Sequence, residues 1–301
     1  MILVTGGTGR LGRALVPRLL GQGMAVRVLT RQREAARALR AEGADVAVGD
    51  IRNPADVAAA VEGCSGVVSA VSGFGPMGSS TPENVDRDGN LTLIRAAKGA
   101  GVARFVLISM RGAAARAPLP LLEMKHAAEE ELRRSGMAWT VVRPSACLET
   151  YLEAMGGALL TEGTTLVLGR ADVPINFVSV QDVSALILKV LTESGWQGRI
   201  LELGGPNLTL GELSGALHSA AGTSGKTRHI PLPMLRLLSL AARPFSPFLA
   251  RAARGAVLLN TTDSTFDPTP AREGIAGLPF TTLADAVGGA AGTRPPAPRL
   301  R

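Results

Sequence analysis

The chain has 301 residues, of which 46% are hydrophobic, 19% charged and 3% aromatic. This is an ordinary globular composition, and the length fits one large domain or a domain with a smaller lobe. The glycines and prolines have no fixed period, which excludes collagen-like and low-complexity chains. No stretch reaches the ~18 apolar residues of a membrane helix, and the chain opens on a strand-like run. We therefore expect a cytoplasmic protein without an integral membrane segment.

The net charge of +7 is spread along the chain. Only four of the 32 basic residues are lysine, leaving 28 arginines, and no basic stripe is interleaved with aromatic residues. We expect no nucleic-acid partner. The exception is the Pro- and Arg-rich tail at 293–301, which we expect to be disordered. Cys64, Cys147 and the three histidines lie far apart, which predicts neither a disulfide framework nor a metal site.

The first 145 residues alternate short apolar runs with alanine-rich amphipathic stretches. Strand-like runs lie at 2–5, 25–29, 45–48, 66–71, 104–109 and 138–142. Helix-like stretches lie at 10–22, 33–42, 54–62, 84–100 and 120–135. The apolar runs do not alternate with polar residues, so both faces of the sheet are expected to be buried. This order predicts an α/β, Rossmann-type, doubly wound parallel sheet over residues 1–145.

The regular alternation of strand-like and helix-like segments ends after Pro144. Strands are predicted at 175–179 and 199–203, and a capped helix at 208–217. We expect residues 146–292 to add strands that complete the sheet, together with a small helical lobe over its carboxyl edge. The segment 230–259 is amphipathic, basic and interrupted by prolines. Its prolines and its predicted role as a lid favour packing against the core over contact with a membrane surface.

The sequence Thr-Gly-Gly-Thr-Gly-Arg-Leu-Gly at 5–12 separates the first predicted strand from the first predicted helix. Gly6 suits a tight turn, Gly9 lets the backbone approach a pyrophosphate, and Gly12 lets helix and strand pack closely. The amides at the start of the helix would hold the anion. This context predicts a dinucleotide site. The remaining loop residues expected at the cofactor are Thr8, Arg10 and Leu11.

The end of the second strand bears on the choice of dinucleotide. A site for NAD(H) needs an acidic residue about 20 residues past the glycines. This strand instead offers Thr30 and Arg31, with Arg33 nearby. Arginine suits a 2′-phosphate, so NADP(H) is favoured and NAD(H) is the alternative. The competing interpretation is a solvated arginine in an arginine-rich protein.

Two further strand ends are expected to line the cofactor. Asp50 and Ile51 follow the third strand and would flank the adenine, by hydrogen bonding and packing respectively; a simple strand-end turn is the alternative. Ala70 and Val71 close the fourth strand, where their backbone would meet the middle of the dinucleotide.

Six segments together resemble one family: TGGTGRLG, VRVLTR, GDIRNPADVAAAVEGCSGVV, VDRDGNLTLIRAAKGAGVARFVLIS, MKHAAEEELRRSGMAWTVVRPS and INFVSVQDVS. In order and spacing they cover roughly residues 1–205 and resemble the NmrA-like, NAD(P)-binding branch of the atypical short-chain dehydrogenase/reductases. Within this branch the chain most resembles the photosystem II assembly factor group and its bacterial relatives. The resemblance implies a nicotinamide dinucleotide as cofactor.

The resemblance also exposes a departure. Dehydrogenases of the wider family carry Tyr-x-x-x-Lys on the helix after the fifth strand, where the tyrosine donates a proton to the substrate carbonyl. Here Lys125 is retained, but Leu121 occupies the tyrosine position, and the only tyrosine, Tyr151, lies well past this helix. Ser109 matches the family's serine and is expected to contact a substrate oxygen.

By the same resemblance, Lys125 would contact the nicotinamide ribose and the backbone at Pro144 would lie beside the nicotinamide. The alternative for Lys125 is an ion pair with Glu129 on the same helical face. Two functions follow. One is an NADPH-dependent reductase of a small molecule, in which Lys125 or Ser109 acts without the tyrosine. The other is a non-catalytic redox sensor or assembly factor that binds a dinucleotide and an unknown protein partner.

Overall fold

A computed structural model describes residues 1–75, 80–223 and 225–292, so the tail predicted at 293–301 lies outside the described residues. The described chain folds as two compact units. The first unit comprises Met1–Ser145, Val180–Leu203 and Thr269–Pro279. The second comprises Ala146–Ser179, Gly204–Pro268 and the chain from Phe280 onward. The chain leaves the first unit after Ser145, where the sequence placed a boundary, and then returns to it twice.

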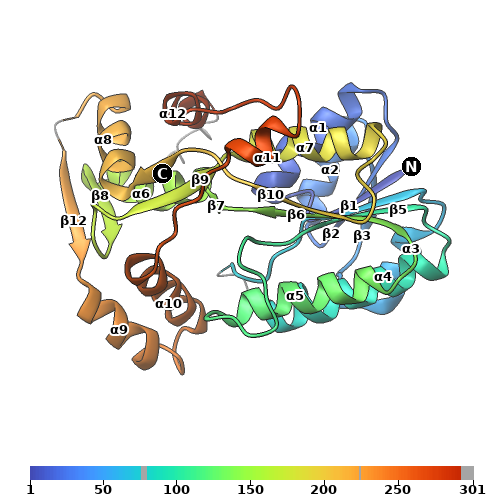
Figure 1. Cartoon of the computed structure of the whole chain (residues 1–301), viewed down its shortest axis with the longest axis horizontal. Coiled ribbons are helices and arrows are strands. Elements are labelled where there is room, and N and C mark those ends of the chain that lie inside the picture. The colour runs from blue at the N-terminus through green and yellow to red at the C-terminus, as the bar shows by residue number, and fades with distance from the viewer. Residues whose placement is uncertain (76–79, 224, 293–301) are drawn as a thin grey trace. The chain divides into compact units, whose positions relative to one another are not determined.

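Within the described residues, the first unit is built on a seven-stranded parallel sheet in the order β10-β6-β5-β4-β1-β2-β3 (Figure 1). Its strands are β1 (Ile2–Thr5), β2 (Val26–Thr30), β3 (Asp45–Val48), β4 (Gly66–Ser69), β5 (Arg104–Ile108), β6 (Ala138–Pro144) and β10 (Arg199–Leu203). Leu3 and Val4 point to opposite faces of the sheet, and both are fully buried. The doubly wound parallel sheet predicted from the uninterrupted apolar runs is confirmed.

Helices cover both faces of this sheet. On one face lie α3 (Pro54–Val61), α4 (Asp88–Gly99) and α5 (Pro120–Arg133), and on the other α1 (Arg10–Gly21) packs beside α7 (Val180–Thr192) (Figure 1). The connection from β2 to β3 is α2 (Arg33–Ala41), and the short α11 (Thr269–Glu273) packs against β10. The strand order reverses between β1 and β4, which opens a crevice for a ligand at the carboxyl ends of the strands.

The helix expected at 84–100 begins earlier than its amphipathic pattern suggested. The structure has a π-helical turn, η1 (Pro82–Arg87), which runs directly into α4. Thr81 caps this turn: its hydroxyl accepts from the Asn84 N–H, and the Asn84 side chain accepts from the Thr81 N–H. Pro82 occupies the first helical position, where no N–H is needed. Wider π turns are uncommon and often occur at functional sites.

The second unit has two small sheets. One has the order β11-β9-β7, formed by β7 (Ala146–Cys147), β9 (Pro174–Val178) and β11 (Asn207–Thr209); the other pairs β8 (Thr164–Leu168) with β12 (Lys226–Ile230). The strand predicted at 175–179 therefore forms, but in a separate sheet. Of the strands expected beyond residue 145, only β10 joins the described main sheet, where it pairs with β6.

The helices of the second unit are α6 (Leu148–Glu162), α8 (Leu210–Ala220), α9 (Leu232–Ala241), α10 (Pro247–Thr261) and α12 (Leu283–Gly292). A hydrophobic core that includes Leu148, Phe177 and Leu213 joins α6, α8 and the β9 sheet. None of the helices in the described part of the chain is long and apolar enough to span a membrane.

Candidate functional site

The loop between β1 and α1 depends on close backbone approaches that only glycine permits. Gly6 has a φ of +81°, and a Cβ there would lie 2.5 Å from the carbonyl oxygen of Ala70. A Cβ on Gly12 would lie 2.4 Å from the Gly6 oxygen, so glycine is needed for α1 to begin directly against the loop. At Gly9 the nearest described atom to a Cβ is the Gly6 oxygen at 3.2 Å. The far side of Gly9 is therefore open to a ligand.

The start of α1 is suited to an anion. Its N-cap is Gly9, which has no side chain to occupy the orphan N–H groups, and its first turn contains no acidic residue. The N–H groups at the start of the helix and the positive end of the helix dipole favour a phosphate here. Arg10 and Leu11 are the first helical residues. The Thr8 carbonyl accepts from Nε of Arg13 at 3.1 Å, which holds the loop against the helix.

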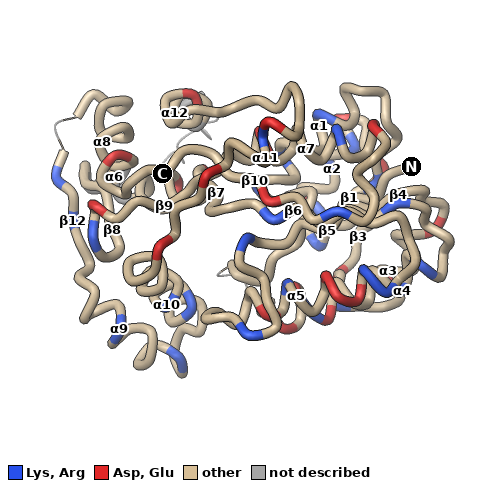
Figure 2. Tube along the Cα trace, viewed as in Figure 1, with Lys and Arg blue, Asp and Glu red and all other residues tan. Residues whose placement is uncertain are grey.

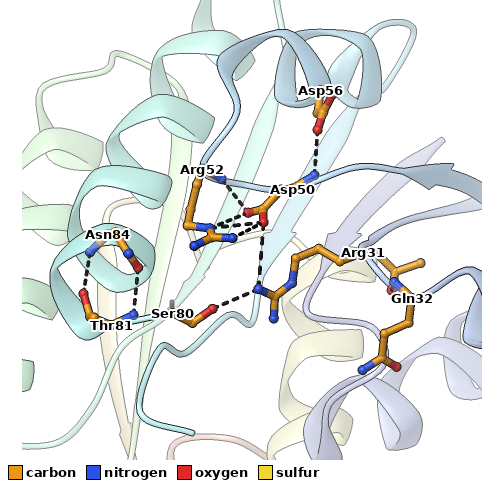
Figure 3. A network of polar contacts seen from close by, with 9 residues as sticks. Arg31, Gln32, Asp50, Arg52, Asp56, Ser80, Thr81 and Asn84 are labelled. Carbon is orange, nitrogen blue, oxygen red and sulfur yellow. Dashed lines mark hydrogen bonds and ion pairs between the residues drawn. The ribbon is translucent and has the colours of Figure 1, made fainter. Parts of the chain in front are cut away.

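At the end of β2, Arg31 reaches toward the end of β3 and the segment before η1 (Figure 3). Its Nη1 donates to Ser80 Oγ at 2.9 Å and lies 3.8 Å from Asp50 Oδ2. The Arg31 side chain is 43% exposed, which leaves the guanidinium accessible. Thr30 is instead buried, and its hydroxyl accepts from the Gln32 N–H at 3.1 Å. Of the two residues, Arg31 is the one whose side chain is exposed.

Asp50 is held in place by a second arginine. The Arg52 guanidinium donates to the Asp50 carboxylate, with Nη2 2.6 Å from Oδ2 and Nε 3.0 Å from Oδ1 (Figure 3). The Asp50 N–H donates to Asp56 Oδ2 at 2.8 Å. Hydrogen bonding from Arg52 holds the pKa of Asp50 below its ordinary value. Ile51 is buried and belongs to the same hydrophobic core as Val57.

Lys125 lies on the buried face of α5 and is only 4% exposed. Its Nζ lies 2.9 Å from Oδ1 of Asp86 and donates to the carbonyl oxygens of Val71 and Ile108, each at 3.0 Å. These three partners match the three N–H groups of an ammonium. The alternative pairing with Glu129 is wrong. Lys125 instead joins the ends of β4 and β5 to the π turn.

The carboxylate that pairs with Lys125 belongs to a polar chain beneath the carboxyl edge of the sheet. Asp86 is fully buried, and its Oδ2 accepts from the Gly73 N–H at 2.7 Å. Asn90, one helical turn later, donates to the Asp86 carbonyl at 2.8 Å and accepts from Ser69 Oγ at 2.6 Å. The sequence interpretation missed both residues. Their four-residue spacing in VDRDGN was the available signal.

Glu129 is the centre of a second buried cluster. Fully buried itself, it accepts a bidentate pair from Arg143, Nε to Oε1 at 2.9 Å and Nη2 to Oε2 at 2.6 Å. The hydrogen bond to this carboxylate raises the pKa of Arg143. The Ser109 hydroxyl also donates to Oε1 of Glu129. Since a hydroxyl has one hydrogen, Ser109 can only accept from any further partner. Pro144 is fixed nearby, where its carbonyl accepts from the Arg111 N–H at 3.0 Å.

Leu121, at the position of the family's tyrosine, and Tyr151, the only tyrosine of the chain, both pack in hydrophobic surroundings. Leu121 is buried on α5 four residues before Lys125. Tyr151 packs in the core of the second unit, with its ring 5.0 Å from that of Phe177. Burial raises the pKa of Tyr151 to about 12. The α5 face therefore offers no phenol beside Lys125.

Comparison with known proteins agrees with this geometry. Residues 6–194 match a family described as NAD(P)H-binding. The chain belongs to this family. The match covers more than half of the chain and includes the glycine loop and α5. It confirms the expected NAD(P)(H) cofactor and fits the atypical short-chain dehydrogenase/reductase, NmrA-like assignment.

The names of the similar proteins describe different activities. The photosystem II assembly factor Ycf39 of Trieres chinensis is 30% identical over 79% of this chain and 74% of its own length. An NAD(P)H azoreductase of Xenophilus azovorans is 31% identical over 74% of each chain. The structure of an NADPH-dependent quinone oxidoreductase from Escherichia coli, complexed with NADPH, has a TM-score of 0.76 and 26% identity, covering 97% of this chain and 100% of that one.

Proposed function

We propose that this protein is an NADPH-dependent reductase that transfers a hydride to a small conjugated acceptor of the quinone class. The observation that carries the proposal is a complete dinucleotide loop combined with Leu121 beside Lys125 on α5. The relatives named as a quinone oxidoreductase and an azoreductase support a reductase, since both would act on conjugated acceptors.

The missing phenol restricts the acceptor. Reduction of a simple ketone generates an alkoxide, at least as basic as hydroxide, which requires an acid in the site. Reduction of a quinone generates a phenolate, whose conjugate acid has a pKa of about 10 and which can take its proton from water. A site with leucine at the acid position is therefore better suited to quinones than to ketones.

The residues of this chain would hold the cofactor and shape the edge at which it reacts. When bound, the nicotinamide supplies the hydride. The glycine loop and the N-terminus of α1 would bind the pyrophosphate, and Arg31 would bind the 2′-phosphate of NADPH. Lys125 would fix the backbone of Val71 at the middle of the dinucleotide, through its bond to the Val71 carbonyl. Because its hydroxyl hydrogen is donated to Glu129, Ser109 would not donate to an oxygen of the quinone.

The test is to measure NADPH binding and NADPH oxidation separately. We expect binding by fluorescence titration and oxidation with a soluble benzoquinone but not with cyclohexanone. The Gly9→Asp variant serves as the control, because it should lose both signals. Rapid reduction of cyclohexanone would overturn the assignment of the acceptor class.

The alternative is a dinucleotide-binding assembly factor without turnover. The resemblance to Ycf39 and the engagement of Lys125 by Asp86 favour it. In that case the protein would bind NADPH but would not oxidise it with any quinone. The same pair of measurements therefore separates the two functions.

A further inference from the structure

The helical hairpin formed by α9 and α10 exposes a group of large apolar side chains. We call it the apolar ridge: Met234, Leu237, Leu240, Phe245 and Leu249. Eight large hydrophobic residues are exposed in the described chain, and five of them are in this ridge. Phe245, in the turn between the two helices, is 89% exposed. Single exposed apolar residues are common, but a contiguous group marks an interaction surface.

The ridge is not the face through which α9 and α10 pack against each other. Leu235 is buried on α9 and packs with Ala253 and Ala256 of α10, with Leu238 beside it. Met234, Leu237 and Leu240 follow a three-residue spacing on a different side of the helix, because each residue advances about 100°. The segment 230–259, expected from the sequence to face the core, therefore uses only part of its apolar surface for packing.

The charged residues of the segment that carries the ridge have one sign. Residues 213–262 contain no aspartate or glutamate. Their basic residues are Lys226, Arg228, Arg236, Arg243, Arg251 and Arg254. Figure 2 shows basic but no acidic positions along α9 and α10. Arg236 and Arg243 are exposed and lie within a few residues of the ridge. The surface therefore joins exposed apolar side chains to the exposed arginines Arg236 and Arg243.

We propose that the α9–α10 hairpin docks on the surface of an anionic lipid bilayer, with the apolar ridge inserted at the boundary of headgroups and acyl chains. Apolar side chains flanked by arginine are typical of helices that lie in the membrane interface. With 10 residues, α9 extends for about 15 Å and would lie in the plane of the surface. This docking goes beyond the proposed reductase activity and does not depend on it.

The same charges argue against a second copy of the chain as the occupant. A two-fold interface would place the same patch on both sides. Arginines with no acidic residues among them would then face one another, which is unfavourable. An anionic lipid surface supplies the opposite charge, and each basic residue near such a surface strengthens binding by about fivefold.

The experiment is flotation of the full-length protein with vesicles of phosphatidylcholine alone or of phosphatidylcholine and phosphatidylglycerol at three to one. We expect flotation with the anionic vesicles only, and its loss in high salt. The Leu237→Ser/Phe245→Ser variant should bind at least about tenfold more weakly. The Arg236→Gln/Arg243→Gln variant should lose about 25-fold, because two such contacts are removed.

Matched controls are Phe280→Ser, an exposed apolar residue outside the ridge, and Arg37→Gln/Arg116→Gln, two exposed arginines outside the hairpin. Both variants should float like the wild type. Circular dichroism should show that every variant is folded. The proposal is overturned by equal flotation with neutral vesicles, or by ridge variants that bind normally. A wild-type dimer that the ridge variant dissociates, without vesicle binding, would show that a second copy covers the ridge.

A last control concerns the basic tail, which could bind anionic vesicles without the hairpin. The Arg294→Gln/Arg299→Gln/Arg301→Gln variant removes its charge. The proposal would also be overturned if this tail variant no longer floated with the vesicles while the ridge variant floated like the wild type.

Discussion

The glycine loop and the buried face of α5 were both expected to contact the same cofactor, yet they are built in different ways. The loop ends in open space at Gly9 and in N–H groups at the start of α1 that no acidic residue of the first turn occupies. On α5, Lys125 and Glu129 are already engaged by Asp86 and Arg143. The loop leaves room for a ligand, whereas the α5 face is a framework of ion pairs. Binding and turnover should therefore be separable by mutation.

The largest effect is expected at the loop. In the Gly9→Asp variant, a carboxylate would occupy the open space and repel the pyrophosphate. We expect NADPH affinity to fall by about a thousandfold or more, which corresponds to about 4 kcal/mol. The thermal unfolding temperature should fall only slightly, because the new Cβ, 3.2 Å from the Gly6 oxygen, requires a shift of a few tenths of an ångström. Unchanged affinity in calorimetry would show that the pyrophosphate binds elsewhere.

Substitutions in the ion pairs of α5 should lower the free energy of unfolding before they weaken NADPH binding. Lys125→Met would leave the Asp86 carboxylate fully buried without its partner. Breaking a buried pair in this way costs about 3–5 kcal/mol, which urea unfolding would detect. The double variant Lys125→Met/Asp86→Asn removes both charges and should recover much of that loss. A Lys125→Met protein of normal stability that no longer binds NADPH would instead establish the predicted ribose contact.

The contrast between the two regions also marks what the sequence could predict. The glycine loop was predictable because its geometry is local: a tight turn and a helix start depend on residues next to one another. The partners of Lys125 were not, because Asp86 lies 39 positions earlier and enters the site only through the π turn. Sequence spacing suggested Glu129 instead, one turn away on the same helix. Arg143 prevents this pairing by reaching Glu129 from the neighbouring strand β6.

At the cofactor's phosphate end, the expected effect is smaller. Arg31→Ala should weaken NADPH binding at least about tenfold and leave NADH binding nearly unchanged, since only NADPH carries the 2′-phosphate. Arg33→Ala is the matched control, because Arg33 is also exposed and begins α2. Calorimetric titration of both dinucleotides would measure the ratio. Equal losses for the two cofactors would indicate a structural arginine, and a loss confined to the Arg33 variant would move the phosphate site there.

The smallest effect concerns Arg52, which contacts Asp50. Arg52 holds the pKa of Asp50 below its ordinary value, so this carboxyl stabilises the fold at neutral pH. The contribution is lost only as pH falls below about 4, through the depressed pKa. In the Arg52→Gln variant, the Asp50 pKa should rise and Arg31 would be the remaining cation near the carboxylate.

The consequence for binding follows from that rearrangement. An Asp50 carboxylate without Arg52 would compete with the 2′-phosphate for Arg31, which lies 3.8 Å away. We expect Arg52→Gln to weaken NADPH binding about two- to fivefold at pH 7, the scale of a partly exposed ion pair, with little effect on NADH. Lowering the pH toward 4 should reduce this difference, because protonated Asp50 no longer competes. An NMR titration of the Asp50 carboxyl would measure its pKa in both proteins. If that pKa is the same with and without Arg52, then Arg31 rather than Arg52 controls the charge of Asp50, and the binding difference should vanish as well.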